Sequence, residues 1–130
     1  MIILDTHAWI WWVLDDDKLT ESQQMSIKEN EAGEIGVSAI SVWEVAKLVE
    51  LGKLKLPNSL EEWFDQALSY PGIRVIELSL QIVIDSTHLP GKFHRDPADQ
   101  IIVATARNFD CPLITSDERI LNYKHVKTIS

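Results

Sequence analysis

The chain opens with the stretch Met1-Ile2-Ile3-Leu4-Asp5-Thr6-His7-Ala8, which decides the class of fold. The apolar run Met1–Leu4 predicts a short buried strand. Asp5 and Thr6 end that strand and can cap a helix that begins near His7. The opening therefore predicts a strand, an acidic residue and a helix in direct succession.

The same alternation of strands and helices continues along the chain. We expect further strands at 35–40, 73–78, 112–115 and 126–129, helices at 20–30, 41–51, 59–69, 79–87 and 96–108, and a turn or short helix at 116–121. Capping-box patterns support three of the helix starts: Thr20 with Gln23, Ser41 with Glu44, and Ser59 with Glu62. Strands that alternate with helices predict an α/β fold with a central, mostly parallel sheet and helices on both faces.

The length and composition fit one soluble domain. With 130 residues, 45% hydrophobic and 25% charged, the chain can bury a full core, so we expect a single domain over 1–130. The longest apolar run, Ala8–Leu14, is too short to span a bilayer, and the first residues lack the basic start of a signal peptide. We therefore expect a cytoplasmic protein without membrane association. The single cysteine, Cys111, excludes an internal disulfide and is expected to be a buried core residue.

The net charge of −8 argues against a broad basic surface for nucleic acid, because such surfaces work by neutralising many phosphates. A cluster of carboxylates that binds Mg²⁺ or Mn²⁺ is a local exception. The bound cations would reverse the local charge and could receive phosphate oxygens. The acidic composition is therefore compatible with a metal-dependent nuclease.

Five polar groups of residues fall where a strand ends or a helix begins. They are Asp5-Thr6-His7, Ser41-Val42-Trp43-Glu44, Asp96-Pro97, Asp99 and Thr115-Ser116-Asp117. In an open α/β fold, strand ends and helix starts share one edge of the sheet, so these acids are expected to meet there. Each acid alone is equally well explained as a helix cap or as a capping-box partner.

Several carboxylates at one edge of the sheet would affect each other's charge, which a single helix-capping acid does not. They repel each other unless cations or raised pKa values relieve the repulsion, and hard divalent cations prefer oxygen ligands. The chain has no zinc-type Cys/His spacing, no phosphate-binding glycine loop and no nucleophilic serine motif. The acids therefore predict a Mg²⁺ or Mn²⁺ centre that could activate water against a phosphodiester.

The polar residues beside these acids have two readings each. Lys92 and Arg95 can contact substrate phosphate, or they can pair with nearby acids. His94 can orient a phosphate or donate a proton near neutral pH, or it can be a satisfied histidine at a helix start. Thr115 and Ser116 can place a hydroxyl on bound water, or they can cap the turn. Both readings stay open at the level of sequence.

The first helix is apolar on every side and must be covered on more than one of them. Ala8–Leu14 includes Trp9, Trp11 and Trp12. These tryptophans can pack in the core against the sheet and a neighbouring helix. They can also anchor a dimer or partner surface, where tryptophan is enriched.

Four motifs, taken in order, carry a resemblance to a known family. They are Asp5-Thr6-His7-Ala8 followed by tryptophans, Ser38-Ala39-Ile40-Ser41-Val42-Trp43-Glu44 with Leu51-Gly52-Lys53-Leu54 after it, His94-Arg95-Asp96-Pro97-Ala98-Asp99, and Thr115-Ser116-Asp117. Together they resemble the PIN-domain ribonucleases, specifically the VapC-type toxins of type II toxin–antitoxin systems. Each motif alone occurs widely by chance, whereas the ordered set over nearly the whole chain is specific.

This resemblance implies a three-layer α/β/α fold and hydrolysis of RNA with Mg²⁺ or Mn²⁺. It implies that Asp5, Glu44, Asp99 and Asp117 form the metal-coordinating and catalytic set. Asp96 is similar to an extra acid that many members carry before the proline. The resemblance also implies a homodimer and a small VapB-like antitoxin that covers the site, with the tryptophan-rich helix contributing to an apolar groove.

The sequence departs from the family pattern at two positions, and two other functions compete with the ribonuclease hypothesis. Ala98 and Gln100 stand where related chains often carry an aromatic residue and an arginine, which affects helix packing and phosphate contact. A phosphoacceptor receiver or related phosphatase also uses Mg²⁺, but it requires paired acids after the first strand and a strand-end lysine. A non-enzymatic binding domain would use the acids as caps and the tryptophans to hold a partner. Stabilisation by Mg²⁺ or Mn²⁺ would separate the nuclease from that binding domain.

Overall fold

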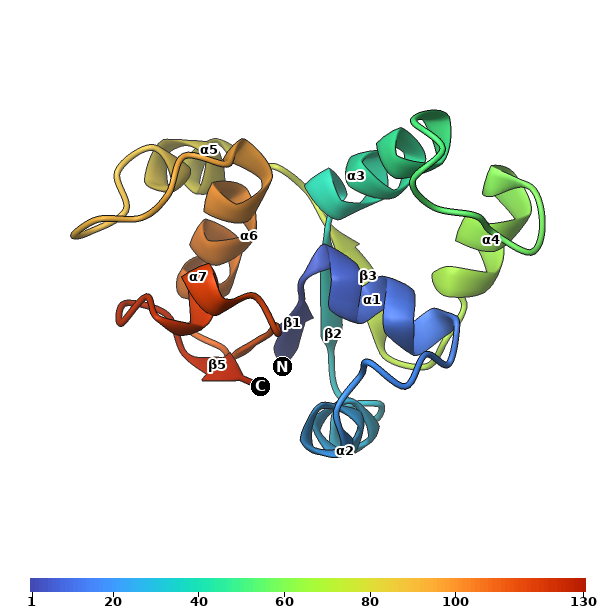
Figure 1. The fold of residues 1–130 in the computed structure, drawn as a ribbon. Coiled ribbons are helices and arrows are strands. Elements are labelled where there is room, and N and C mark those ends of the chain that lie inside the picture. The colour runs from blue at the N-terminus through green and yellow to red at the C-terminus, as the bar shows by residue number, and fades with distance from the viewer.

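The computed structural model describes residues 1–130 and contains a five-stranded sheet in which all neighbouring strands are parallel. The strands are β1 (Ile2–Leu4), β2 (Ile35–Ser38), β3 (Ile73–Ile76), β4 (Leu113–Ile114) and β5 (Thr128–Ile129). They lie in the order β3-β2-β1-β4-β5, with helices on both faces (Figure 1). The three-layer α/β/α fold expected from the sequence is confirmed.

Seven helices connect the strands. They are α1 (Thr6–Val13), α2 (Glu21–Glu29), α3 (Ala39–Glu50), α4 (Leu60–Ala67), α5 (Leu80–Ser86), α6 (Pro97–Asn108) and α7 (Glu118–Leu121). Helices α1, α3 and α4 lie on one side of the sheet and α5, α6 and α7 on the other (Figure 1). Helix α2 adds Ile27 to the core on the side of α1. None of the seven combines the length and the apolar composition that crossing a bilayer requires.

Strand β1 shows how one element serves two cores. Ile2 and Leu4 belong to a core that also contains Trp9 of α1 and Trp63 of α4. Ile3 belongs to the core on the opposite face, built largely from α6. Alternate residues of a strand point to opposite faces, and here both faces are covered. A continuous apolar run is therefore the pattern that this central strand requires.

The chain winds away from β1 in two directions, and this fixes where a site can form. β2 and β3 follow on one side of β1, while β4 and β5 lie on the other. The winding reverses between β1 and β4, and ligands of open α/β sheets bind at the carboxyl ends of strands at such a point. Helices α1 and α7 start at this edge, with Asp5 and Asp117 as their caps.

Most helix starts expected from capping residues are confirmed. Helix α2 begins with a complete capping box. At the start of each of the other four helices, the side chain of the predicted cap residue accepts a hydrogen bond from a backbone N–H. The confirmed caps are Asp5, Thr20, Ser59, Ser79 and Asp96. Local side chain to backbone bonding of this kind can be read directly from sequence.

The start expected for the third helix is wrong. Ser41 lies inside α3, which begins at Ala39 with Ser38 as its cap, and Ile40 N–H donates to Ser38 Oγ at 3.2 Å. Strand β2 is therefore shorter than the expected 35–40. Ser38 already satisfies the helix start, which leaves the Ser41 hydroxyl for a tertiary contact. The last three strands are likewise shorter than their apolar runs, because backbone pairing stops before the hydrophobic pattern does.

The three tryptophans of α1 divide between core and surface. Trp9 is completely buried, with its ring centroid 5.2 Å from that of Trp63 and 6.2 Å from that of Phe64. Trp11 and Trp12 are half-buried. The prediction that Trp9 packs in the core is therefore correct. The prediction that Trp9 contributes to a partner surface is wrong, because its side chain is fully buried. Trp11 and Trp12 remain available for such a surface.

Candidate metal centre

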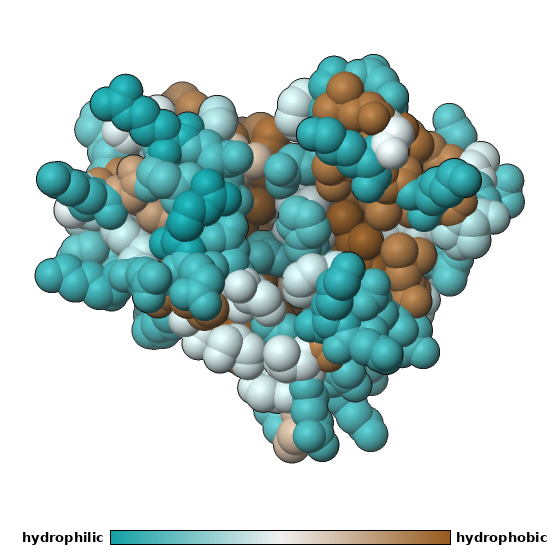
Figure 2. Space-filling view, in the orientation of Figure 1, coloured by the Kyte–Doolittle hydropathy of each residue, from teal (hydrophilic) through white to brown (hydrophobic).

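The acidic residues singled out in the sequence line one cavity at the carboxyl edge of β1 and β4. The cavity holds about 310 Å³ and is lined by Asp5, Thr6, His7, Trp11, Glu44, Asp96, Asp99, Ser116, Asp117 and Arg119. Figure 2 shows a hydrophilic recess between the α6–α7 side of the molecule and the α1–α3 side. The expected gathering of five carboxylates is present in the fold, while their catalytic role stays a prediction.

Asp5 directly follows β1 and is fixed by its surroundings. Its backbone N–H donates to Ile114 O of β4 at 3.0 Å, and its Oδ1 accepts from the Ala8 N–H at 2.8 Å. The residue is only 6% exposed. Burial raises the pKa of Asp5 above its usual value, although hydrogen bonds from Thr115 and Ala8 oppose the rise. A carboxyl buried in this way ionises readily only when a positive charge is near.

Glu44 reaches the cavity from the second turn of α3 and is oriented by Thr6. The Thr6 hydroxyl donates to Glu44 Oε1 at 2.5 Å, and its oxygen lies 2.8 Å from Ser41 Oγ. These buried hydroxyls tie the start of α1 to the start of α3. Burial raises the pKa of Glu44 despite the Thr6 hydrogen bond, and the charge of Asp96 adds to the rise. Thr6 is therefore a positioning residue, although its sequence position suggests only a helix start.

Asp99 carries a strongly perturbed carboxyl group. It lies in the first turn of α6, where its N–H donates to the cap residue Asp96 at 3.1 Å, and its side chain is 17% exposed. Burial and the charges of Asp96, Asp117 and Glu44 raise the pKa of Asp99 to about 7. The carboxyl group therefore exchanges a proton near neutral pH when no cation is bound.

Two basic side chains, Arg119 and His94, face these acids. Arg119 Nη2 lies 3.1 Å from Asp117 Oδ2 and 3.6 Å from Asp99 Oδ2. His94 Nε2 lies 3.0 Å from Asp99 Oδ2, but it is not directed for a hydrogen bond. The pKa of Asp117 lies below its usual value. Burial alone would raise it, but the hydrogen bonds from Arg119 together have the larger, opposite effect. Arg119, which no sequence pattern marked, thus bridges two of the acids.

The hydroxyls of Thr115 and Ser116 have different roles. Thr115 is completely buried, and its Oγ1 accepts from the Asp117 N–H at 3.0 Å while it also hydrogen-bonds Asp5. It positions two acids and does not line the cavity, which corrects its expected role as a substrate contact. Ser116 lines the cavity and accepts from Gln23 Nε2 at 3.1 Å. Gln23 is fully buried and also donates to Thr115 O at 3.1 Å, so it supports the turn before α7.

The basic residues expected to steer a substrate do not all reach the acids. His94 contacts Asp99, whereas Lys92 and Arg95 border a separate hollow of about 450 Å³. Both of these side chains are exposed, and neither forms an ion pair. A substrate contact from Lys92 or Arg95 therefore requires a strand that extends beyond the acidic cavity.

The donor set fits a hard divalent cation. The carboxylates offer the oxygen ligands that Mg²⁺ and Mn²⁺ prefer, and no thiol lines the cavity. As the side chains stand, no three acidic or histidine groups are close enough together to form a ligand set. Arg119 contacts both Asp99 and Asp117. A cation held by Asp99 and Asp117 would therefore compete with Arg119 for the same carboxylates.

Two solved structures resemble this fold over nearly their whole length. VapBC2 from Rickettsia felis, bound to a DNA fragment from its promoter, has a TM-score of 0.71 and 17% identity, and the match covers 100% of both chains. A toxin–antitoxin complex from Klebsiella pneumoniae has a TM-score of 0.70 and 19% identity, with 100% of this chain and 97% of that chain covered. At these identities the likeness establishes the fold alone.

The sequence comparisons identify the family. Ribonuclease VapC22 of Mycobacterium tuberculosis (strain ATCC 25618 / H37Rv) is 29% identical over 129 residues, which cover 99% of this chain and 96% of that protein. Residues 2–126 match the model of the PIN domain. The family expected from the four ordered motifs is therefore confirmed, and this chain belongs to the PIN-domain family.

Proposed function

We propose that this protein is a Mg²⁺- or Mn²⁺-dependent endoribonuclease that hydrolyses phosphodiester bonds of RNA. One observation carries the proposal: five carboxylates from four separate helix starts or helices surround one cavity, and burial raises the pKa of three of them. Such a concentration of acids costs stability unless cations bind there, whereas a helix cap needs no second acid beside it. The likeness to a protein named a ribonuclease supports RNA as the substrate.

In this proposal Asp5, Glu44, Asp99 and Asp117 hold the cation, and Asp96 is a further ligand beside Asp99. A bound divalent cation supplies Lewis-acid stabilisation of phosphate charge and lowers the pKa of water. The carboxylates come from different elements, so the ligand set is complete only when the sheet and both helical layers are assembled. Cleavage and cation binding should therefore be lost together when the fold is loosened.

The remaining polar side chains orient this set. Thr6 holds Glu44 at the cavity, and Thr115 holds Asp5 and the backbone of Asp117. Arg119, once released from the acids, is placed to contact a phosphate oxygen as a planar donor. These groups act through position and charge, which is how most phosphoryl-transfer catalysis works.

We also propose that the protein is the toxin of a pair and acts in the cytoplasm, where a small VapB-like antitoxin neutralises it. Apolar side chains gather over α3 beside the recess (Figure 2), where Trp43 and Leu51 are 57% and 54% exposed. A partner segment laid on this surface would bury those side chains, and Trp11 on the cavity wall would extend the contact to the acids. The solved VapBC2 complex and the toxin–antitoxin complex support this class of partner.

A homodimer is the second proposed assembly. Leu80, Val83 and Ile84 form an apolar stripe on α5 and are 78%, 43% and 44% exposed. Residues three and four positions apart share one helix face, so a second copy could cover all three side chains at once. Sedimentation of the purified protein, compared with Val83→Glu, tests this assembly, and equal sedimentation of the two as monomers would exclude this face.

Cleavage of RNA tests the proposed activity directly. Labelled single-stranded RNAs and transfer RNAs are incubated with the purified protein in Mn²⁺, Mg²⁺ or chelator, beside Asp99→Asn. We expect cleavage that requires the cation and is lost in the variant. Calorimetric titration of Mn²⁺ provides the second measurement. Absence of both cleavage and Mn²⁺ binding would contradict the proposal and favour a domain that only binds a partner.

A further inference from the structure

Charge is distributed unevenly along this acidic chain. Residues 1–87 contain six Lys and Arg residues against fifteen Asp and Glu residues. Residues 88–130 contain six Lys and Arg residues against five acids, of which Asp96, Asp99 and Asp117 line the cavity. Outside the cavity, the part formed by residues 88–130 is therefore basic, while the rest of the molecule would repel a polyanion.

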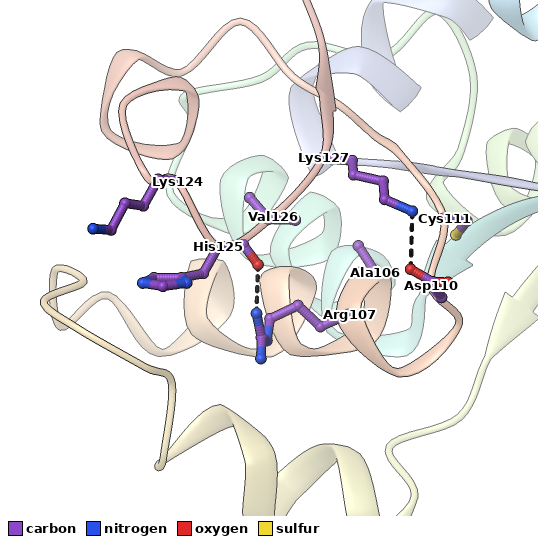
Figure 3. A pocket seen from close by; sticks show the side chains of 8 residues that line it. All are labelled: Ala106, Arg107, Asp110, Cys111, Lys124, His125, Val126 and Lys127. Carbon is purple, nitrogen blue, oxygen red and sulfur yellow. Dashed lines mark hydrogen bonds and ion pairs between the residues drawn. The ribbon is translucent and has the colours of Figure 1, made fainter.

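Several of these basic residues surround a pocket at the far end of α6. The pocket holds about 420 Å³, and its lining includes the basic or acidic residues Arg107, Asp110, Lys124, His125 and Lys127 (Figure 3). Lys127 Nζ lies 3.0 Å from Asp110 Oδ1, and Arg107 donates to the His125 carbonyl oxygen. Lys124 forms no side-chain hydrogen bond or ion pair, and Figure 3 shows it directed away from Asp110. The pocket therefore keeps a net positive charge, and the Lys124 ammonium group is the one without a partner.

Packed loops connect this pocket to the loop that precedes α6. Tyr123 OH donates to Pro90 O, and the Tyr123 ring lies 4.9 Å from Phe93 and 5.4 Å from His125, centroid to centroid. A Cβ built on Gly91 would lie 3.4 Å from His125 Nε2, so the two loops touch. The hollow bordered by Lys92 and Arg95 begins on the same loop.

The pocket also lies within reach of a strand bound at the acids. Arg107 follows Asp99 by eight residues on α6, a separation of about 12 Å along the axis at ~1.5 Å per residue. Arg119 lies in α7, and Lys124 follows the last residue of α7 by three positions. The segments that carry Asp99 and Arg119 at the cavity therefore lead on to Arg107 and Lys124 at the pocket.

We propose that the pocket formed by Arg107, Lys124, His125 and Lys127 holds backbone phosphates of the RNA strand that is cleaved in the acidic cavity. This inference rests on the proposed ribonuclease function. Contacts to phosphate supply affinity without reading bases, and they make binding depend on salt. The pocket therefore contributes to substrate binding and not to the chemical step. A short RNA that ends before the pocket should not use it.

Kinetics of Lys124 variants test this role. Lys124→Glu and Lys124→Gln remove an unpaired, exposed ammonium group, so neither change disturbs a native contact. Lys53→Glu, at an exposed lysine just after α3, is the matched control for net charge. Initial rates are measured against the concentration of a labelled 30-nucleotide single-stranded RNA with Mn²⁺, at low and moderate salt.

We expect KM to rise roughly 3- to 10-fold for Lys124→Glu with kcat unchanged, and the control to match the wild type. Loss of one phosphate contact in Lys124→Gln should lower the salt slope of log affinity by about 0.7. An unchanged KM in both variants, or an equal rise in the Lys53→Glu control, would overturn the proposal.

Binding measured without cleavage separates this inference from the proposed activity. Fluorescence polarisation of the same RNA in chelator reports binding even if the wild type cleaves nothing. Weaker binding by Lys124→Glu than by Lys53→Glu supports the phosphate pocket. Equal binding by wild type, Lys124→Glu and Lys53→Glu refutes the pocket, whatever the cleavage assay shows.

Discussion

Replacing Asp99 by Asn should make the cation-free protein more stable while it abolishes cleavage. The pKa of Asp99 is raised from 3.8 to about 7, so the folded state holds the proton more tightly than the unfolded chain does. Stability must therefore fall as pH rises from about 4 to about 7, because over this range the folded state keeps a proton that the unfolded chain has already released. Asn has the same shape without the charge and should escape this loss.

The size of the effect follows from the pKa. Taken at full value, the change from 3.8 to about 7 corresponds to about 4 kcal/mol at 1.36 kcal/mol per pKa unit. Solvent reaches the carboxyl group, whose side chain is 17% exposed, and screening reduces the repulsion from its neighbours. We therefore expect Asp99→Asn to raise the free energy of unfolding at pH 8 by about 1–2 kcal/mol, or about 5 °C in Tm. At pH 4 the difference should vanish.

Urea unfolding followed by circular dichroism in chelator, from pH 4 to pH 8, measures this difference. Asp65→Asn, at an exposed acid of α4 without a side-chain partner, is the control and should change stability little. Saturating Mn²⁺ should then reverse the order, because the wild type gains more from the cation than a variant that lacks one ligand. If Asp99→Asn is no more stable than the wild type at pH 8, burial and the neighbouring charges do not raise the pKa of Asp99 in this way.

Three further substitutions test the groups that organise the cavity. Gln23→Glu keeps the capping-box acceptor but loses the Nε2 donor to Thr115 O, Ser116 Oγ and Ile129 O, so chemical denaturation should show a loss of about 2–4 kcal/mol, against little change for exposed Gln66→Glu. Thr6→Val should lower stability by about 1–3 kcal/mol and slow cleavage, because Glu44 loses its hydroxyl donor; cleavage at the wild-type rate would contradict this. Arg119→Gln should tighten Mn²⁺ binding roughly 5-fold in calorimetry, because a competing charge is removed, and weaker binding would show that Arg119 does not oppose the cation.

Local patterns account for the parts of the fold that could be predicted. The burial of β1 follows from a continuous apolar run, and the start of α6 follows from a cap residue before Pro97. Both signals involve neighbours in the chain, so one segment is enough to read them. The error at Ser41 has the same origin: Ser38 and Ser41 both offer cap-like hydroxyls, and only the tertiary contact with Thr6 decides between them.

Of the residues in the candidate site, only the acidic ones could be predicted from the sequence. Strand ends and helix starts of an α/β fold must share an edge, so topology brought Asp5 and Asp117 together without any knowledge of side chains. Gln23 and Arg119 were not predictable in this way. Gln23 contacts a turn that lies 92 residues later in the chain, and Arg119 meets Asp99 through the packing of α7 beside α6. Contacts of this kind depend on the assembled layers, and no local spacing encodes them.

The acidic residues around Asp99 should both lower the stability of the folded protein at neutral pH and provide its affinity for a cation. Without a cation, Arg119 offsets part of the repulsion around Asp99, yet the pKa of Asp99 stays at about 7 because Arg119 does not balance the burial and the neighbouring acids. A divalent cation carries twice the charge of Arg119 and can approach several carboxylates at once, so it should displace the arginine. The Arg119 guanidinium would then be available to a phosphate of the proposed RNA substrate at the cavity edge. Cation binding and substrate binding should therefore strengthen each other, and Arg119→Gln should weaken this coupling even though it tightens the cation alone.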